Sequence, residues 1–91
     1  MISLQEAISL AREKYKAKIC LLEENDKAFI VFFSEDDGTI PPGLYPWRVD
    51  KEDGSLQLFM PDHPEFFKPV KRLPFPDGYG DLFVEPKYPE E

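Results

Sequence analysis

The sequence has few of the residues that bring chemistry of their own: one cysteine, one histidine and five glycines among 91 residues. A single cysteine, Cys20, excludes an internal disulfide bond, and one cysteine with one histidine cannot build a structural zinc site. No stretch approaches the ~20 apolar residues of a membrane span, and no basic segment with a long apolar run marks a secretory signal. We therefore expect a soluble cytoplasmic protein without membrane contact.

Patterns for catalysis or metal binding are missing as well. Cys20 lies in an apolar run, where burial raises a thiol's pKa instead of activating it, and His63 has no identifiable nucleophile beside it. Two acidic loops at residues 35–38 and 50–54 resemble calcium loops, but with each glycine at loop position six, position one is apolar. The sequence therefore predicts neither an enzyme nor a cofactor or metal site.

The net charge of −7 is unevenly distributed. Residues 1–18 hold four Lys or Arg against two Asp or Glu, whereas residues 77–91 hold five acids against one Lys. An acidic field repels phosphate backbones and argues against nucleic-acid binding. The charge suits a basic protein partner, but it also suits plain solubility, and composition alone leaves both explanations open.

One amphipathic helix is predicted near the amino terminus. Apolar residues recur there with helical spacing at Leu4, Ala7, Ile8, Ala11 and Tyr15. Ser3 and Glu6 have the spacing of a capping box, which predicts where the helix begins. Basic residues follow near its other end, where they complement the helix dipole.

Four strands are expected after the helix, at residues 18–23, 27–33, 45–50 and 55–59. The second is a continuous apolar run, which is typical of a central strand covered on both faces. The helix would cover one face, and a partner is one candidate for the other. Asp53-Gly54 predicts the hairpin turn between the last two strands.

The second half of the chain is rich in proline, with eight of the ten prolines at or after Pro46. We expect one short helical turn starting at Pro64 and then an extended tail packed over the body. The predicted architecture is a single α+β domain over residues 1–91. A helix on a four-stranded antiparallel sheet forms the body at residues 1–60, and residues 61–91 form the turn and the tail.

The helix, two apolar strands and a Trp-x-Val-Asp-Lys-x-x-Gly-x-Leu hairpin follow one another in a recognisable order. In this chain the hairpin residues are Trp47, Val49, Asp50, Lys51, Gly54 and Leu56. Over residues 1–60 the pattern resembles the YrhB-type proteins, also called the immunity protein 35 family, of bacterial polymorphic toxin systems. A weaker similarity connects the same helix and hairpin to PepSY-type domains. The proline-rich end after residue 68 matches no part of either pattern.

The resemblance implies a non-catalytic cytoplasmic protein that neutralises a cognate toxin by occlusion. We expect this chain to act as a monomer or a homodimer. It supplies no contact residues, so the candidates come from charge and exposure: an acidic loop for basic groups of the toxin, and aromatic residues for apolar contacts. Tyr79, between two glycines, is the aromatic expected to be most exposed. The candidate partner-binding residues are Glu35, Asp36, Asp37, Phe67, Tyr79 and Asp81. A PepSY-like chaperone or regulatory domain that binds extended peptides is the alternative.

Overall fold

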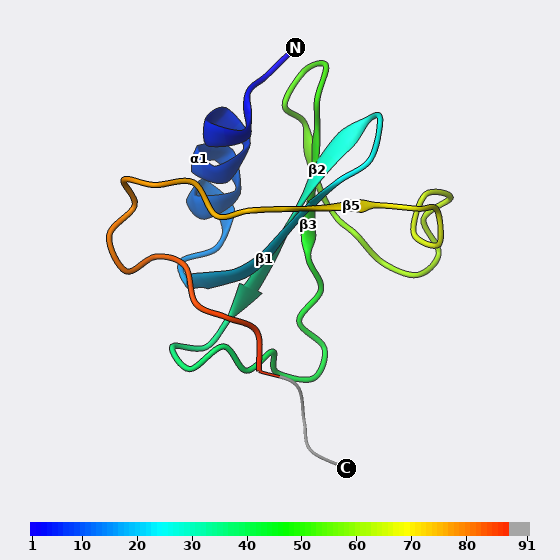
Figure 1. The fold of residues 1–91 in the computed structure, drawn as a ribbon. Helices are drawn as coiled ribbons and strands as arrows, with labels where there is room; N and C mark the ends of the chain where they lie inside the picture. The colour runs from blue at the N-terminus through cyan, green and yellow to red at the C-terminus, as the bar shows by residue number, and fades with distance from the viewer. Residues whose placement is uncertain (88–91) are drawn as a thin grey trace.

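A computed structural model describes residues 1–87 and shows one helix packed on a five-stranded antiparallel sheet (Figure 1). The elements are α1 (Leu4–Lys14), β1 (Lys18–Glu24), β2 (Ala28–Ser34), β3 (Trp47–Asp50), β4 (Leu56–Leu58) and β5 (Lys71–Leu73). The strand order is β4-β3-β2-β1-β5, with β2 at the centre. The predicted α+β class is confirmed, and the sheet has one strand more than predicted.

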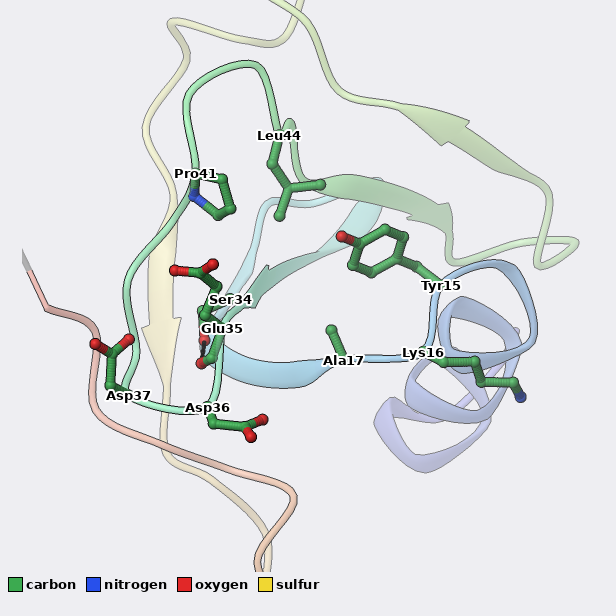
Figure 2. Close-up of a pocket in the computed structure, with 9 residues that line it drawn as sticks. All are labelled: Tyr15, Lys16, Ala17, Ser34, Glu35, Asp36, Asp37, Pro41 and Leu44. Atoms are coloured by element: carbon green, nitrogen blue, oxygen red, sulfur yellow. Dashed lines mark hydrogen bonds between the residues drawn. The ribbon is translucent and has the colours of Figure 1, made fainter.

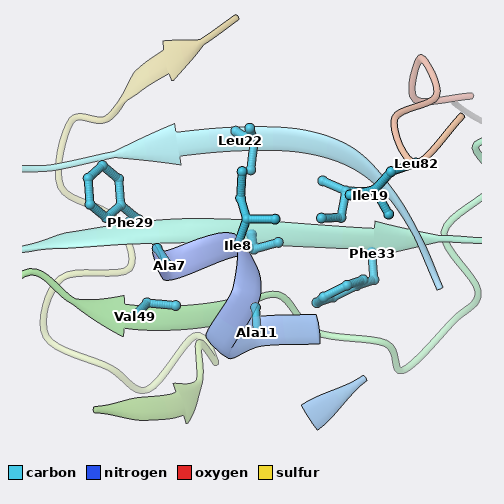
Figure 3. Close-up of a cluster of buried hydrophobic side chains, with 10 residues drawn as sticks. Ala7, Ile8, Ala11, Ile19, Leu22, Phe29, Phe33, Val49 and Leu82 are labelled. Atoms are coloured by element: carbon cyan, nitrogen blue, oxygen red, sulfur yellow. The ribbon is translucent and has the colours of Figure 1, made fainter. Parts of the chain in front are cut away.

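Helix α1 forms for the reasons that the sequence indicates. The Ser3 hydroxyl accepts a hydrogen bond from the Glu6 backbone N–H at 3.1 Å, and the Glu6 carboxylate accepts one from the Ser3 N–H at 3.2 Å. This capping box satisfies two backbone donors that a helix start otherwise leaves unpaired. The buried side of the helix packs on β2 and β3 through Ala7, Ile8 and Ala11 (Figure 3).

The main core lies between α1 and the sheet. Alternate residues of β2 point toward the helix, namely Phe29, Val31 and Phe33, and Val49 of β3 lies beside them (Figure 3). Leu82, from the segment after β5, closes one end of this cluster. Burying a side chain of this size contributes about 1.5–3 kcal/mol, so these residues supply much of the stability of so small a domain.

The opposite face of the sheet is covered by the chain itself. Ala28 and Ile30 of β2 pack with Phe59 in a second buried cluster, and Phe66 contacts this cluster from the loop after β4. In that loop, i to i+3 hydrogen bonds close two successive turns, Phe66 N–H to His63 O and Lys68 N–H to Glu65 O. In place of the predicted helical turn at Pro64, the loop consists of turns without a helix.

A buried ion pair anchors the same loop to the sheet. The Arg48 guanidinium on β3 donates through Nε and Nη2 to the two Glu65 oxygens, at 3.1 and 3.0 Å. Asn25 donates to Glu65 at 3.0 Å, and Asp50 lies 3.4 Å from Arg48 Nη1. Because both pair members are nearly fully buried, the bidentate geometry compensates for their lost hydration. Nothing in the sequence pattern indicated this pair.

The residues after this loop were predicted to form an extended tail. They first add strand β5 to the edge of the sheet and then continue without regular secondary structure. In β5, Leu73 pairs with Leu22 of β1 and contacts the main core, which explains why this short segment joins the sheet. The chain then returns to the start of β1, where Ile19 N–H donates to Leu82 O and Val84 N–H donates to Ile19 O, each at 3.0 Å. The end of the predicted tail, residues 88–91, lies outside the described part of the chain.

Candidate partner-binding groove

A groove of about 530 Å³ lies where the end of α1 meets the loop between β2 and β3 (Figure 2). One wall carries the acids of the predicted loop, and the other carries Tyr15, Ala17 and Leu44. The full lining is Tyr15, Lys16, Ala17, Ser34, Glu35, Asp36, Asp37, Pro41 and Leu44. The groove thus combines carboxylates with an apolar wall, a combination that suits a long basic side chain.

The acidic loop is held in place by its own hydrogen bonds and by the end of the described chain. Glu35 N–H donates to Thr39 O at 2.8 Å, and the Asp37 carboxylate accepts from the Thr39 N–H at 2.9 Å. Gly38 has a φ of 91°, and Lys87 N–H donates to its carbonyl at 2.9 Å. A side chain at residue 38 would collide with the backbone carbonyl of Glu85, so this turn requires glycine.

The three loop acids differ in their roles. Asp37 bonds to Thr39 and lies 3.7 Å from Lys87 Nζ, and the hydrogen bonding to Thr39 lowers the pKa of the Asp37 carboxyl. Glu35 and Asp36 form no ion pair with any of residues 1–87. Both are exposed, so their carboxylates are available at the groove, whereas Asp37 stabilises the loop.

A second hollow of about 280 Å³ continues from the first, because Lys16, Ala17 and Asp36 line both. Its remaining lining is Arg12, Lys18, Tyr79, Asp81 and Leu82. Lys18 Nζ lies 3.1 Å from Asp81 Oδ2 and also donates to the Asp81 carbonyl at 2.6 Å. This contact lowers the pKa of the Asp81 carboxyl and holds the segment around it against β1.

Five of the six candidate residues chosen from the sequence therefore line these two adjoining hollows, and Phe67 lines neither. Phe67 lies on the loop that crosses the other face of the sheet, with 84% of its surface exposed. The expectation that Tyr79 is the most exposed aromatic is wrong for the described residues. Its ring lies 5.3 Å from that of Phe83 and contacts the main core, so it is half-buried.

The charge of the groove is more balanced than the sequence suggested. Arg12, in the last turn of α1, and Lys16 and Lys18, which follow the helix, line the second hollow together with Asp36 and Asp81. Tyr15 was expected only as part of the helix's apolar stripe, but its ring packs 5.2 Å from Phe33, and the residue, which is 37% exposed, also lines the groove. This apolar wall forms because the end of the helix lies beside a loop that follows it by some twenty residues in the chain.

Cys20 and His63, residues of the types most often used in catalysis, both lie in positions that stabilise the fold. Cys20 is fully buried as expected, and its burial raises the pKa of the thiol. His63 Nδ1 accepts a hydrogen bond from the Glu65 N–H at 3.0 Å, which fixes a turn of the loop over the sheet. Within residues 1–87, no group of three or more His, Cys, Asp or Glu is placed to hold a metal ion. In the same range, no helix has the length and apolar character to cross a membrane.

Comparison of the chain with protein-family models, curated proteins and solved structures found no match.

Proposed function

We propose that this chain is a non-catalytic immunity protein that binds a cognate toxin and neutralises it by occlusion. The observation that carries the proposal is that two segments chosen from the sequence for partner contact line adjoining hollows. These segments, the β2–β3 loop and the turn near Tyr79, lie more than forty residues apart in the sequence. A surface with exposed carboxylates beside apolar and aromatic walls supports binding of a basic protein, and the resemblance over residues 1–60 supports a toxin as that protein.

In the proposed complex, Glu35 and Asp36 contact basic side chains of the toxin. Tyr15 and Leu44 pack against the aliphatic stems of those side chains. Asp37 and Asp81, which the sequence placed among the contact residues, act instead by holding the loop and the neighbouring turn. Opposite charges at an interface speed association and discriminate between partners more than they increase affinity.

Co-expression with the product of the adjacent gene tests the proposal. If that product is the toxin, the chain restores growth of cells that express it and the two proteins co-purify at a fixed stoichiometry. A harmless neighbour, or a toxic one that remains unbound and kills regardless, would overturn the immunity proposal and favour the PepSY-like peptide binder.

A pair of isosteric variants then tests the groove. E35Q/D36N removes two negative charges from the groove, and E52Q/D62N removes two from exposed positions outside it. We expect association of E35Q/D36N with the toxin to be about 10-fold slower at low salt, with a weaker salt dependence, because steering by nearby charges is lost. The control variant should change association much less. Equal kinetics for the two variants would remove the acidic loop from the interface.

A further inference from the structure

The two edges of the sheet differ in how they are protected. The outer strand β5 carries Lys71 and Arg72 and is flanked by Pro69 and Pro74. Charges and prolines of this kind prevent a sheet edge from pairing with another chain. The other edge, β4, lies in the segment Ser-Leu-Gln-Leu-Phe-Met at residues 55–60, which has neither a charge nor a proline. In a chain with 32% charged residues, this edge has neither kind of protection.

The backbone of β4 presents unpaired groups to the outside. Asp50 N–H donates to Ser55 O at 2.9 Å and Phe59 N–H donates to Pro46 O at 2.8 Å. Antiparallel hydrogen bonding alternates along a strand, so Gln57 bonds to β3, and the N–H and C=O groups of Leu56 and Leu58 point away from the sheet. No hydrogen bond from elsewhere in residues 1–87 reaches these groups.

We propose that a second copy of this chain pairs with β4 in antiparallel orientation, with the two-fold axis at Gln57, so that the two sheets become one. Leu56 of each copy then lies opposite the second copy's Leu58, and each such pair exchanges both N–H···O bonds. The two Gln57 residues face each other as a non-hydrogen-bonded backbone pair, in which side chains approach most closely. The backbone groups that are now unpaired would thereby become paired.

The side chains of β4 favour a second copy as the occupant. Leu56 and Leu58 pair with Val49 and Trp47 and so lie on the helix side of the sheet, and Leu58 keeps 44% of its surface exposed. Two-fold pairing places these leucines against each other, while the neutral Gln57 amides can bond to one another on the other side. The whole chain is acidic, so two copies repel at long range, and added salt should strengthen the dimer.

Sedimentation equilibrium of the wild-type chain, Q57K and Q57E tests this pairing. We expect wild type to reach twice the chain mass of 10.6 kDa at the upper end of a concentration series. Each variant places two like charges at the axis, so its dissociation constant should rise about fivefold or more. An equimolar mixture of Q57K and Q57E should restore association, because opposite charges then meet. Gln57 is exposed, so thermal melts of the monomers should remain close to wild type.

The matched control is K71E, which changes the charge of the opposite edge and should leave the wild-type self-association intact. A wild-type chain that remains at 10.6 kDa up to ~1 mM, the weak end of measurable binding, would overturn the proposal. Dissociation constants that do not change in Q57K and Q57E, or a mixture that fails to restore association, would also overturn it. The pairing is independent of the proposed function, because no residue of β4 lines either hollow of the candidate site.

Discussion

Replacing Glu65 with alanine should destabilise the protein more than most single substitutions. The carboxylate of Glu65 holds the buried Arg48 guanidinium through two hydrogen bonds and also accepts one from Asn25. In E65A the guanidinium, whose side chain exposes 8% of its surface, keeps only the Asp50 carboxylate at 3.4 Å. A buried positive charge held by that single longer contact would then remain in the space between the sheet and the loop over it.

The expected loss in the free energy of unfolding follows from that geometry. Removing one member of a buried ion pair costs about 3–5 kcal/mol of folding stability. Because the Asp50 contact remains, we expect E65A to lose about 3 kcal/mol. A domain of this size has a free energy of unfolding of roughly 5–14 kcal/mol, so the variant still folds. With a urea m-value of about 1.5 kcal/mol/M, the unfolding midpoint should fall by about 2 M.

Urea unfolding followed by circular dichroism measures this loss, and the double variant R48M/E65L serves as the control. Replacing both partners with apolar residues leaves no buried charge, so its free energy of unfolding should lie within about 1 kcal/mol of wild type. The reasoning is refuted if E65A loses less than about 1 kcal/mol or if the double variant is as unstable as E65A.

The same pair predicts a pH dependence. Hydrogen bonding from Arg48 lowers the pKa of the Glu65 carboxyl. A carboxyl with a lowered folded-state pKa contributes its full stability above its unfolded pKa of about 4.3, and this is lost as the pH falls through the folded value. Between pH 7 and pH ~3 wild type should therefore lose more stability than E65Q, which has no carboxyl to protonate. Parallel pH profiles of the two urea midpoints would contradict the assignment.

Two further pairs of variants test the loops. G38A should lose at least ~2 kcal/mol, because its φ is positive and its Cβ would collide with the Glu85 backbone, whereas G43A, with a similar φ and open space, should lose only about 1 kcal/mol. F66A should lose about 2–4 kcal/mol because its ring packs on the second cluster, whereas the exposed F67A should remain within about 0.5 kcal/mol of wild type. Urea unfolding distinguishes the members of each pair, and equal losses within a pair would contradict the corresponding assignment.

Part of the candidate site could be predicted because its acidic residues lie in a segment with the composition of a loop. Glu35 and Asp36 follow an apolar strand and precede Gly38, so their exposure was foreseeable from composition alone. The structural role of Asp37 was not, because it depends on Thr39 and on Lys87 fifty residues away. The burial of Tyr79 was missed for the same reason: its flanking glycines suggest exposure, but Phe83 and the core cover most of its surface.

The features that could be predicted from the sequence are those set by contacts within a few residues. The capping box of α1, the apolar stripe of that helix, the central strand β2 and the hairpin that turns at Gly54 all follow from local hydrogen bonding and side-chain periodicity. Each of these signals lies within one element or one turn, so neighbouring residues are enough to specify it.

The contacts between distant segments could not be predicted and became known only from the folded chain. Tertiary packing added β5 to the sheet through Leu73, covered the second face of β2 with the loop that carries Phe66, and paired Arg48 with Glu65. It also joined the end of α1 to the acidic loop in one groove. Such contacts depend on the shape of the surface that the other elements leave open and on the entropic cost of closing long loops. No local sequence pattern specifies either of these.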